Sequence, residues 1–192
     1  MKEMVESILA QMPPHTRFTD ADSAIVTANK DLLLEMGQGL VESFYRTVLA
    51  HPATAEIFHP DEMDARAASL ADWWRRTCEG PHDSDFFSWQ AFVGLVHIKR
   101  RVKNPMVIAM WSHILAHIST ALAHRMGAAE AGQVMCSLQR LAATVQALIV
   151  ESYLQSFIDI LSESTGMKPV LIDRLVMTKI DSVIGAARAA AA

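Results

Sequence analysis

The sequence has 192 residues and a mass of 21.2 kDa, is 51% hydrophobic, and carries a formal net charge of −4 at pH 7. This length suits one domain with a substantial hydrophobic core. The charge is mild, and the one tight basic cluster is the run 99–101. Nucleic-acid binding requires a larger basic face, so we expect no nucleic-acid partner.

The cysteines and the apolar segments indicate in which cellular compartment the protein is expected. Cys78 and Cys136 lie far apart and belong to no C-x-x-C motif, which favours a reducing cytoplasm over a disulfide framework. The first fifteen residues contain Glu3 and Glu6 and lack the apolar run of a signal peptide. The most hydrophobic stretch, residues 141–161, is interrupted by polar residues and is too polar to span a bilayer. We expect a soluble cytoplasmic protein without a membrane segment.

Helical periodicity extends along almost the whole chain, whereas strand signals are few. After a first segment that ends at Pro13-Pro14, helices are predicted, in chain order, over the low twenties and thirties, about 38–50, about 61–79, about 84–101, 104 to about 126, about 128–163, and along the tail after residue 166. The expected N-terminal caps are Thr19 or Asp20, Asp61, Asp83 or Ser84, and Asn104, which precedes Pro105.

This pattern predicts an all-α protein of seven or eight helices, with loops too short and varied for a simple up-down bundle. There is no internal repeat and no Gly/Ser linker. We assign residues 1–166 to one domain, with its core at about 20–163. We assign residues 167–192 to an amphipathic tail or linker helix.

Glu-x-x-His strings are the signature of di-iron helical bundles. Two occur, Glu56 to His59 and Glu79 to His82, but Pro60 follows the first and Gly80-Pro81 interrupts the second. Neither pair shares a helical face, which argues against a di-iron centre.

A second histidine pattern is His113, His117 and His124, of which the first two are four residues apart on one helix. Such spacing is able to bind zinc. No third ligand follows at motif spacing, so a solvated or interface stripe is favoured. The catalytic motifs of hydrolases, phosphate loops and metalloproteases are missing from the sequence as well.

His97 stands out in the string "FVGLVHIKRRVKNP" (92–105). At helical spacing, Phe86, Val93 and His97 fall close together on one face, which is strongly apolar. One interpretation is a core histidine whose nitrogens are satisfied by hydrogen bonds, because an unmet lone pair costs about 1–3 kcal/mol. The other is an iron ligand beneath a flat apolar cofactor.

Two hydroxyl groups are candidates for the opposite side of such a pocket. Tyr45 lies in mid-helix among apolar neighbours, where it is either a ligand-facing donor or an ordinary core tyrosine bonded to a carbonyl. Ser69 lies one turn before Trp73 on the same face. It either lines a narrow cavity or bonds back to its own helix.

Three strings together resemble the sensor globins, the lineage of globin-coupled sensors and protoglobins. "FYRTVLAHPATAEIF" is similar to that family's distal tyrosine helix and its exit. "SLADWWRRTCEG" is similar to the distal helix, which ends in glycine 17 residues before the proximal histidine. "VGLVHIKRRVKNP" resembles the V-G-x-x-H element. The resemblance covers about residues 20–163.

The resemblance implies a globin-like fold that binds haem b, iron protoporphyrin IX. It makes His97 the proximal iron ligand and places Tyr45 and Ser69 on the distal side. It also implies a set of residues that contact the porphyrin, namely Phe58, Trp73, Val93 and Val102. The usual distal histidine is missing, and Arg66 lies near its place. Whether Arg66, Lys99 or Arg100 pairs with the propionates stays open.

The implied function is a gas sensor that binds O2, and also CO and NO, rather than an enzyme. Family members often continue into an output domain, so the expected partners are such a domain or a separate protein. The long helix 128–163 and the helix before it are expected to form a symmetric homodimer. The alternative is a haem-free globin-fold regulatory module, whose pocket Trp73 and Trp74 would fill. A haem enzyme would need an electron donor domain or a polar distal acid–base pair, and neither is seen.

Overall fold

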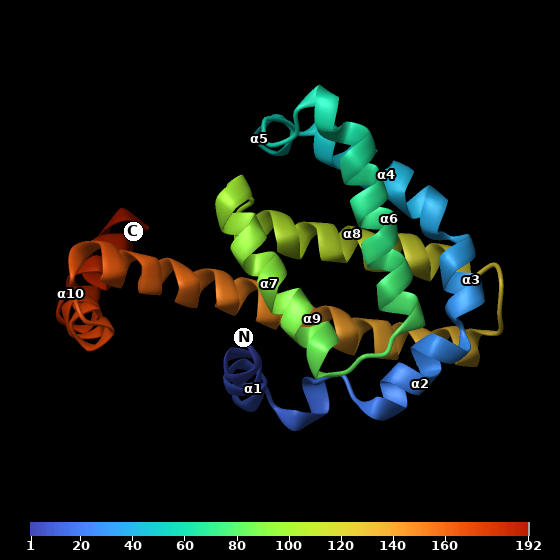
Figure 1. Ribbon diagram of the computed structural model, residues 1–192, viewed down its shortest axis with the longest axis horizontal. Coiled ribbons are helices and arrows are strands. Elements are labelled where there is room, and N and C mark those ends of the chain that lie inside the picture. The colour runs from blue at the N-terminus through green and yellow to red at the C-terminus, as the bar shows by residue number, and fades with distance from the viewer. Residues whose placement is uncertain (192) are drawn as a thin grey trace. The chain divides into compact units, whose positions relative to one another are not determined.

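The computed structural model describes residues 1–191, which form α-helices joined by short loops and contain no strand (Figure 1). The helices are α1 (Lys2–Gln11), α2 (Asp20–Ala28), α3 (Lys30–Glu35), α4 (Gly37–Ala50), α5 (Pro52–Ala55), α6 (Met63–Glu79), α7 (Ser84–Arg100), α8 (Asn104–Leu122), α9 (Ala128–Thr165) and α10 (Pro169–Ala190). Two 3-10 turns span Pro14–Thr16 and Pro60–Glu62. The all-α prediction is confirmed, although there are more helices than the seven or eight expected.

One extra helix arises because the segment expected as a single helix breaks at Asn29. The Asn29 side chain donates to the carbonyl of Ile25 at 2.9 Å, and this bond closes α2 before α3 begins. Asparagine competes for backbone partners in this way, which is why it disfavours helix interiors.

Two predicted helix starts hold and two are wrong. Thr19 and Asp22 form a reciprocal capping box on α2, and Asp83 accepts from the first amides of α7. Asp61, in contrast, lies in a 3-10 turn, and α6 starts at Met63. Asn104 is the first residue of α8 rather than its cap, and its buried Oδ1 has no partner among the described residues. Pro105 in the first turn costs no hydrogen bond, because the amides there lack helical acceptors.

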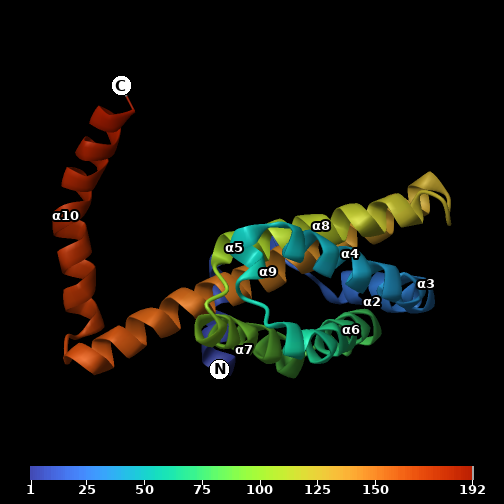
Figure 2. The ribbon, with the colours of Figure 1, turned by 90° about the horizontal axis from the view of Figure 1, so that it is seen from above.

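The chain divides into two compact units, Met1–Tyr153 and Leu154–Ala192. In the first unit, Figure 2 shows α6 and α7 on one side and α4 and α8 on the other. Its main core includes Leu33, Leu40, Trp74, Trp111, Ile118, Leu138 and Leu141. By length and composition, α8 and α9 are each apolar enough to span a membrane, but a core helix of a soluble protein passes the same test.

The first helix packs against α7 in a smaller core. Val5 and Ile8 of α1 contact Ala91 of α7 and Leu148 of α9 in a buried cluster. Lys2 also forms a 2.8 Å ion pair with Asp85 at the start of α7. The helix that carries His97 is therefore supported by α1 along its outer side.

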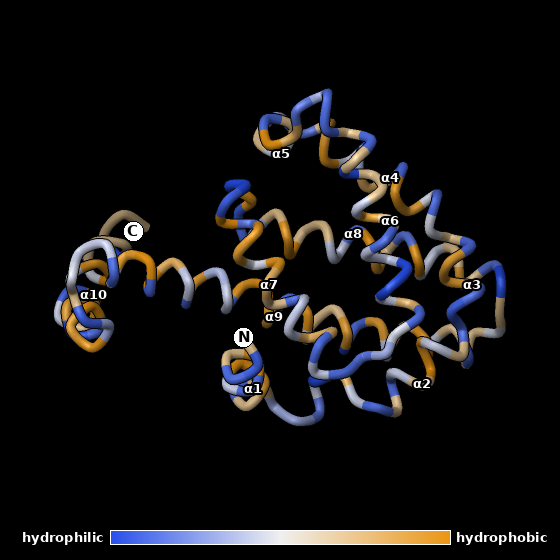
Figure 3. The backbone as a smooth tube through the Cα atoms, viewed as in Figure 1, coloured by the Kyte–Doolittle hydropathy of each residue, from blue (hydrophilic) through white to orange (hydrophobic). Residues whose placement is uncertain are grey.

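The second unit contains the end of α9, a turn at Gly166 with φ of +71°, and α10. The tail helix predicted from the sequence is α10, which contains both polar and apolar residues (Figure 3). Its exposed apolar side chains are Val170, Leu171, Leu175, Val176, Met177, Ile180, Val183 and Ile184. The domain boundary assigned at residue 166 falls in the turn before α10 and stays a prediction.

Candidate functional site

The first unit contains a cavity of about 460 Å³ whose lining residues come from α4 to α9 and the loops between them. The structure brings together every residue that the sequence singled out as a site residue. The cavity is lined by His97, Tyr45, Ser69, Phe58, Trp73, Val93 and Val102, among others. Lining a common cavity is what their predicted roles require, but the roles themselves stay predictions.

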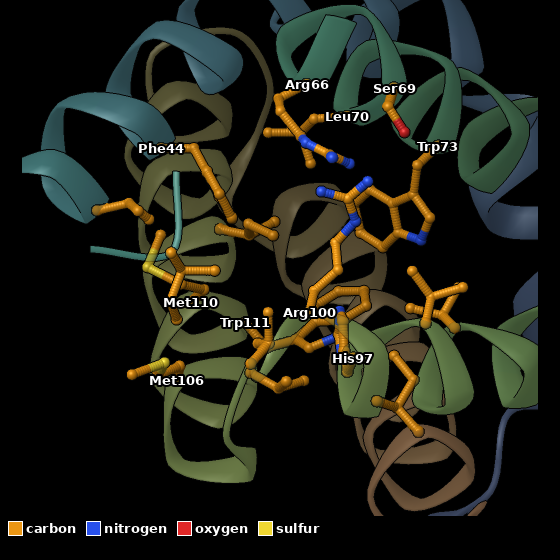
Figure 4. A pocket seen from close by; sticks show the side chains of 18 of the residues that line it. Phe44, Arg66, Ser69, Leu70, Trp73, His97, Arg100, Met106, Met110 and Trp111 are labelled. Atoms are coloured by element: carbon orange, nitrogen blue, oxygen red, sulfur yellow. The ribbon is translucent and has the colours of Figure 1, made fainter. Parts of the chain in front are cut away.

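His97 enters the cavity from the last turns of α7, facing α6 across it (Figure 4). Burial lowers the pKa of His97 to about 4, so the imidazole is neutral at pH 7. Its buried Nδ1 has no hydrogen-bond partner among residues 1–191. One interpretation of the sequence was a core histidine whose ring nitrogens are satisfied by hydrogen bonds. The described residues provide no such bond to Nδ1.

α7 is held in place from α9 as well as from α1. The Ser152 hydroxyl donates to the carbonyl of Ala91 at 2.8 Å, in the middle of α7. Ser152 is fully buried, so water does not compete for this bond. The contact holds α7 at Ala91, less than two turns before His97, and so helps to fix the position of the imidazole in the cavity.

Tyr45 lies on α4 and faces the cavity, with its ring edge-to-face against Phe58 at a centroid distance of 5.7 Å. Burial raises the pKa of Tyr45 to about 12, although the charge of Arg66 limits the rise. No hydrogen bond to its hydroxyl is found within the described residues. The alternative of a core tyrosine bonded to a carbonyl is therefore not what the structure shows.

Ser69 projects from α6 toward the cavity beside Trp73 (Figure 4). In the same helix Thr77 bonds back to the carbonyl of Trp73 at 2.7 Å. No such bond is found for Ser69 in the part of the chain that the structure describes. Its hydroxyl is consequently free to meet a ligand.

The two adjacent tryptophans of α6 have different surroundings. Trp73 lines the cavity, contacts Trp111 at a centroid distance of 5.2 Å, and donates to Gln90 Oε1 at 3.3 Å. Trp74 points into the main core, where its indole nitrogen donates to the carbonyl of Leu33 at 2.9 Å. The expectation that Trp74 would fill the pocket in a haem-free globin is therefore wrong. A helix turns 100° per residue, so the two adjacent side chains point in different directions.

Three arginines line the cavity: Arg66, Arg76 and Arg100. Arg76 stacks over the Trp89 ring at 3.8 Å, a cation–π contact. Lys99, which the sequence allowed as a propionate partner, is exposed and does not line the cavity.

Three of the other histidines contact residues outside the cavity instead. The ring of His113 shares a 3.0 Å hydrogen bond with Ser43 of α4, and His117 lies beside Gly39 of the same helix. His82 bonds Ser23 at 2.7 Å and the carbonyl of Thr77 at 2.9 Å. Across the described residues, no group of three or more possible metal ligands occurs.

Sequence reasoning missed the wall of the cavity that α8 supplies. Met106, Met110 and Ile114 line it together with Trp111. The signal was available, because positions 106, 110 and 114 repeat every four residues and so form one apolar stripe. Nothing in the sequence tells which side of α8 faces the cavity.

This geometry defines the class of protein. The helices enclose an apolar cavity that His97 and Tyr45 both line, and this all-α arrangement is globin-like. The ferric globin domain of E. coli DosC has the same fold: the TM-score is 0.54 at 16% sequence identity, over 77% of this chain and 96% of that one. No curated protein sequence matches the chain.

The family follows from the sequence comparison. The Protoglobin family model matches residues 6–157, which is most of the chain. The protein thus belongs to the Protoglobin family, and the sensor-globin resemblance of the three strings is confirmed at this level.

Proposed function

We propose that the protein binds haem b through His97 and acts as a sensor of diatomic gases. The observation that carries this proposal is the His97 imidazole, neutral and without a protein partner for its buried nitrogen, in a cavity with aromatic walls. An unpaired buried nitrogen costs about 1–3 kcal/mol. The imidazole thus keeps a ring lone pair that no hydrogen bond within residues 1–191 uses, and a metal is able to accept it.

The cavity residues fit a porphyrin. The cavity volume of about 460 Å³ lies in the range of small-molecule sites, about 300–1,000 Å³. Phe58, Val93 and Val102 offer apolar surface to a flat ring, and Trp73 adds an indole face from α6. Haem iron held by histidine supplies reversible binding of O2, CO and NO.

Tyr45 of α4 and Ser69 of α6 line the same cavity as His97, and each hydroxyl is able to donate a hydrogen bond to a bound gas. With a pKa near 12, the Tyr45 phenol stays protonated throughout the physiological range and remains a donor. A neutral hydrogen bond contributes about 0.5–1.5 kcal/mol, which corresponds to roughly a threefold to tenfold effect on gas affinity. An effect of this size suits a sensor that must release its ligand.

We propose a binding protein rather than an enzyme, located in the cytoplasm and acting through a homodimer or an output partner. The exposed positions of α8 support an interface there. Ile108, Ala109, Ser112, Ala116 and Ser119 are all exposed, and none of them carries a charge. Depletion of charge is typical of interface cores.

The decisive experiment is the absorption spectrum of the purified protein after addition of hemin, reduction, and exposure to CO. We expect a Soret band that shifts on reduction and shifts again with CO. His97→Ala should lose this spectrum and regain part of it with free imidazole. His113→Ala is the matched control, because His113 is also a half-buried histidine but lies outside the cavity. A protein that stays colourless with hemin contradicts the proposal and favours the haem-free module.

A further inference from the structure

The mouth of the cavity is crossed by a bridge of three charged side chains. Glu62 Oε2 accepts from Arg66 Nη2 at 2.9 Å and from Arg66 Nε at 3.3 Å. The same oxygen accepts from Arg100 Nη1 at 3.1 Å, although Arg100 lies 38 residues away at the end of α7. Figure 4 shows the guanidinium groups of Arg66 and Arg100 approaching each other across the cavity. The bridge therefore ties the wall that bears Ser69 to the wall that bears His97.

The charges at this mouth are unbalanced. Both guanidinium groups share one carboxylate, and Arg76 adds a third positive charge to the lining. Asp72 is the single carboxylate in the lining, and it is held at 2.6 Å by Arg75, which lies outside it. The mouth consequently keeps an excess of positive charge that favours an anionic group on any ligand entering the cavity.

The carboxylate of Glu62 in this bridge is also easily replaced by another carboxylate. The side chains of Arg66, Glu62 and Arg100 are 22%, 36% and 37% exposed, so water screens all three. Ion pairs of this kind contribute little to stability. Guanidinium groups bind any carboxylate with the same forked geometry, so one carboxylate is readily substituted by another.

We propose that Glu62 is an internal stand-in for a carboxylate of the ligand. Arg66 and Arg100 form a carboxylate site at the cavity mouth, which Glu62 occupies until a porphyrin carboxylate replaces it. This inference rests on the proposed haem function, because it assumes that a porphyrin enters this cavity. Glu62 then slows uptake of porphyrins that carry free carboxylates, and it closes the mouth again when the porphyrin leaves.

The test measures how fast the full-length apoprotein takes up four probes: hemin, hemin dimethyl ester, metal-free protoporphyrin IX, and its dimethyl ester. Hemin uptake is followed at the Soret band, and uptake of the metal-free porphyrins by quenching of tryptophan fluorescence, since Trp73, Trp89 and Trp111 line the cavity. Glu62→Gln removes the competing charge. Glu35→Gln is the matched control, because it breaks the Arg125–Glu35 surface pair of 2.7 Å outside the cavity.

We expect Glu62→Gln to speed uptake of both free acids severalfold and to leave uptake of both esters unchanged. Arg100→Gln should speed release of the free acids severalfold, again without an effect on the esters. Equal acceleration of acids and esters would mean that Glu62 merely blocks the opening, and the exchange is then refuted. If Glu62→Gln takes up all four probes at the same rates as Glu35→Gln, the exchange is also refuted.

The metal-free probes separate this inference from the haem proposal. If hemin produces no histidine-ligated spectrum while metal-free protoporphyrin IX keeps its preference over the ester, the haem function fails and the carboxylate site stands. If hemin gives the expected spectrum and acids and esters behave alike in every variant, the carboxylate site fails by itself.

Discussion

Gly94 of α7 lies against Ser152 of α9 so closely that a Cβ atom on residue 94 would stand 2.2 Å from Ser152 Oγ and 2.6 Å from the carbonyl oxygen of Ile149. Real Cβ atoms essentially never approach other atoms this closely. The two helices meet at this distance because residue 94 has no side chain. Three residues later on α7 comes His97, so this contact sets the position of the proposed iron ligand.

Gly94→Ala should therefore damage both stability and haem binding. The Ile149 carbonyl belongs to the backbone and cannot move aside, so α7 must shift away from α9. We expect a loss of about 1–3 kcal/mol in the free energy of unfolding, measured with urea, and faster transfer of haem to a scavenger. Gly132→Ala in α9 is the control, because its Cβ meets nothing within 4 Å. Equal behaviour of the two variants would show that the close contact has no role.

Tyr45→Phe should speed O2 dissociation severalfold. The change removes only the hydroxyl, which lies in the cavity and remains protonated below its pKa of about 12. Loss of a hydrogen bond worth about 0.5–1.5 kcal/mol corresponds to roughly a threefold to tenfold faster off-rate in stopped-flow measurements. Tyr153→Phe, at the other tyrosine of the chain, should have no such effect, because Tyr153 lies outside the cavity. An unchanged off-rate in Tyr45→Phe rules out the proposed donor.

Asp22 should make stability depend on acid pH. It is buried, accepts from Ser137 Oγ and Arg140 Nε at 2.9 Å each, and forms a further ion pair with Arg140 Nη2. Burial by itself raises the pKa of Asp22, but the bonds from Arg140, Thr19 and Ser137 outweigh it and hold the pKa at about 2.

Because the folded pKa lies below the unfolded value of 3.8, the contribution of Asp22 is present in full above pH 4. It should be lost as the pH falls from about 4 to about 2, and it amounts to about 2 kcal/mol. Asp22→Asn should lower the free energy of unfolding at pH 7 and reduce its further loss between about pH 4 and pH 2, both measured by urea titration. Asp20→Asn, which changes an exposed carboxylate of the same helix, should retain the loss of stability at acid pH. If Asp22→Asn still loses the same stability as the pH falls from about 4 to about 2, that loss arises from other groups.

The proposed dimer predicts that a charge on the outer face of α8 dissociates it. Ala116 is exposed and lies amid uncharged neighbours, so Ala116→Glu would bury an unpaired carboxylate in a dimer interface. Light scattering at micromolar concentration should give a dimer for the natural sequence and a monomer for this variant. Gln38→Glu, at an exposed position of α4, should leave the dimer intact. A natural protein that is monomeric under these conditions refutes the interface.

Local sequence signals were sufficient for most of the secondary structure. The capping box at Thr19, the cap at Asp83 and the glycine after α9 are short-range features, and each one marks its helix end where expected. The errors at Asp61 and Asn104 are displacements of one or two residues, which is the usual uncertainty of helix ends. The division of α2 from α3 was missed because Asn29 is a weak breaker whose effect depends on its own side-chain bond to Ile25.

What the sequence by itself determined is the all-α class, the helix order, and the apolar face of α7 around His97, because periodicity and spacing along a helix are local properties. The site residues on other elements were named from the resemblance to sensor globins. Only the tertiary structure decided which of two adjacent tryptophans faces the cavity, that α8 supplies a wall with Met106 and Met110, and that Glu62 joins Arg66 to Arg100. These relationships join residues far apart in the chain. They depend on the distance and rotation at which helices pack, which no local pattern encodes.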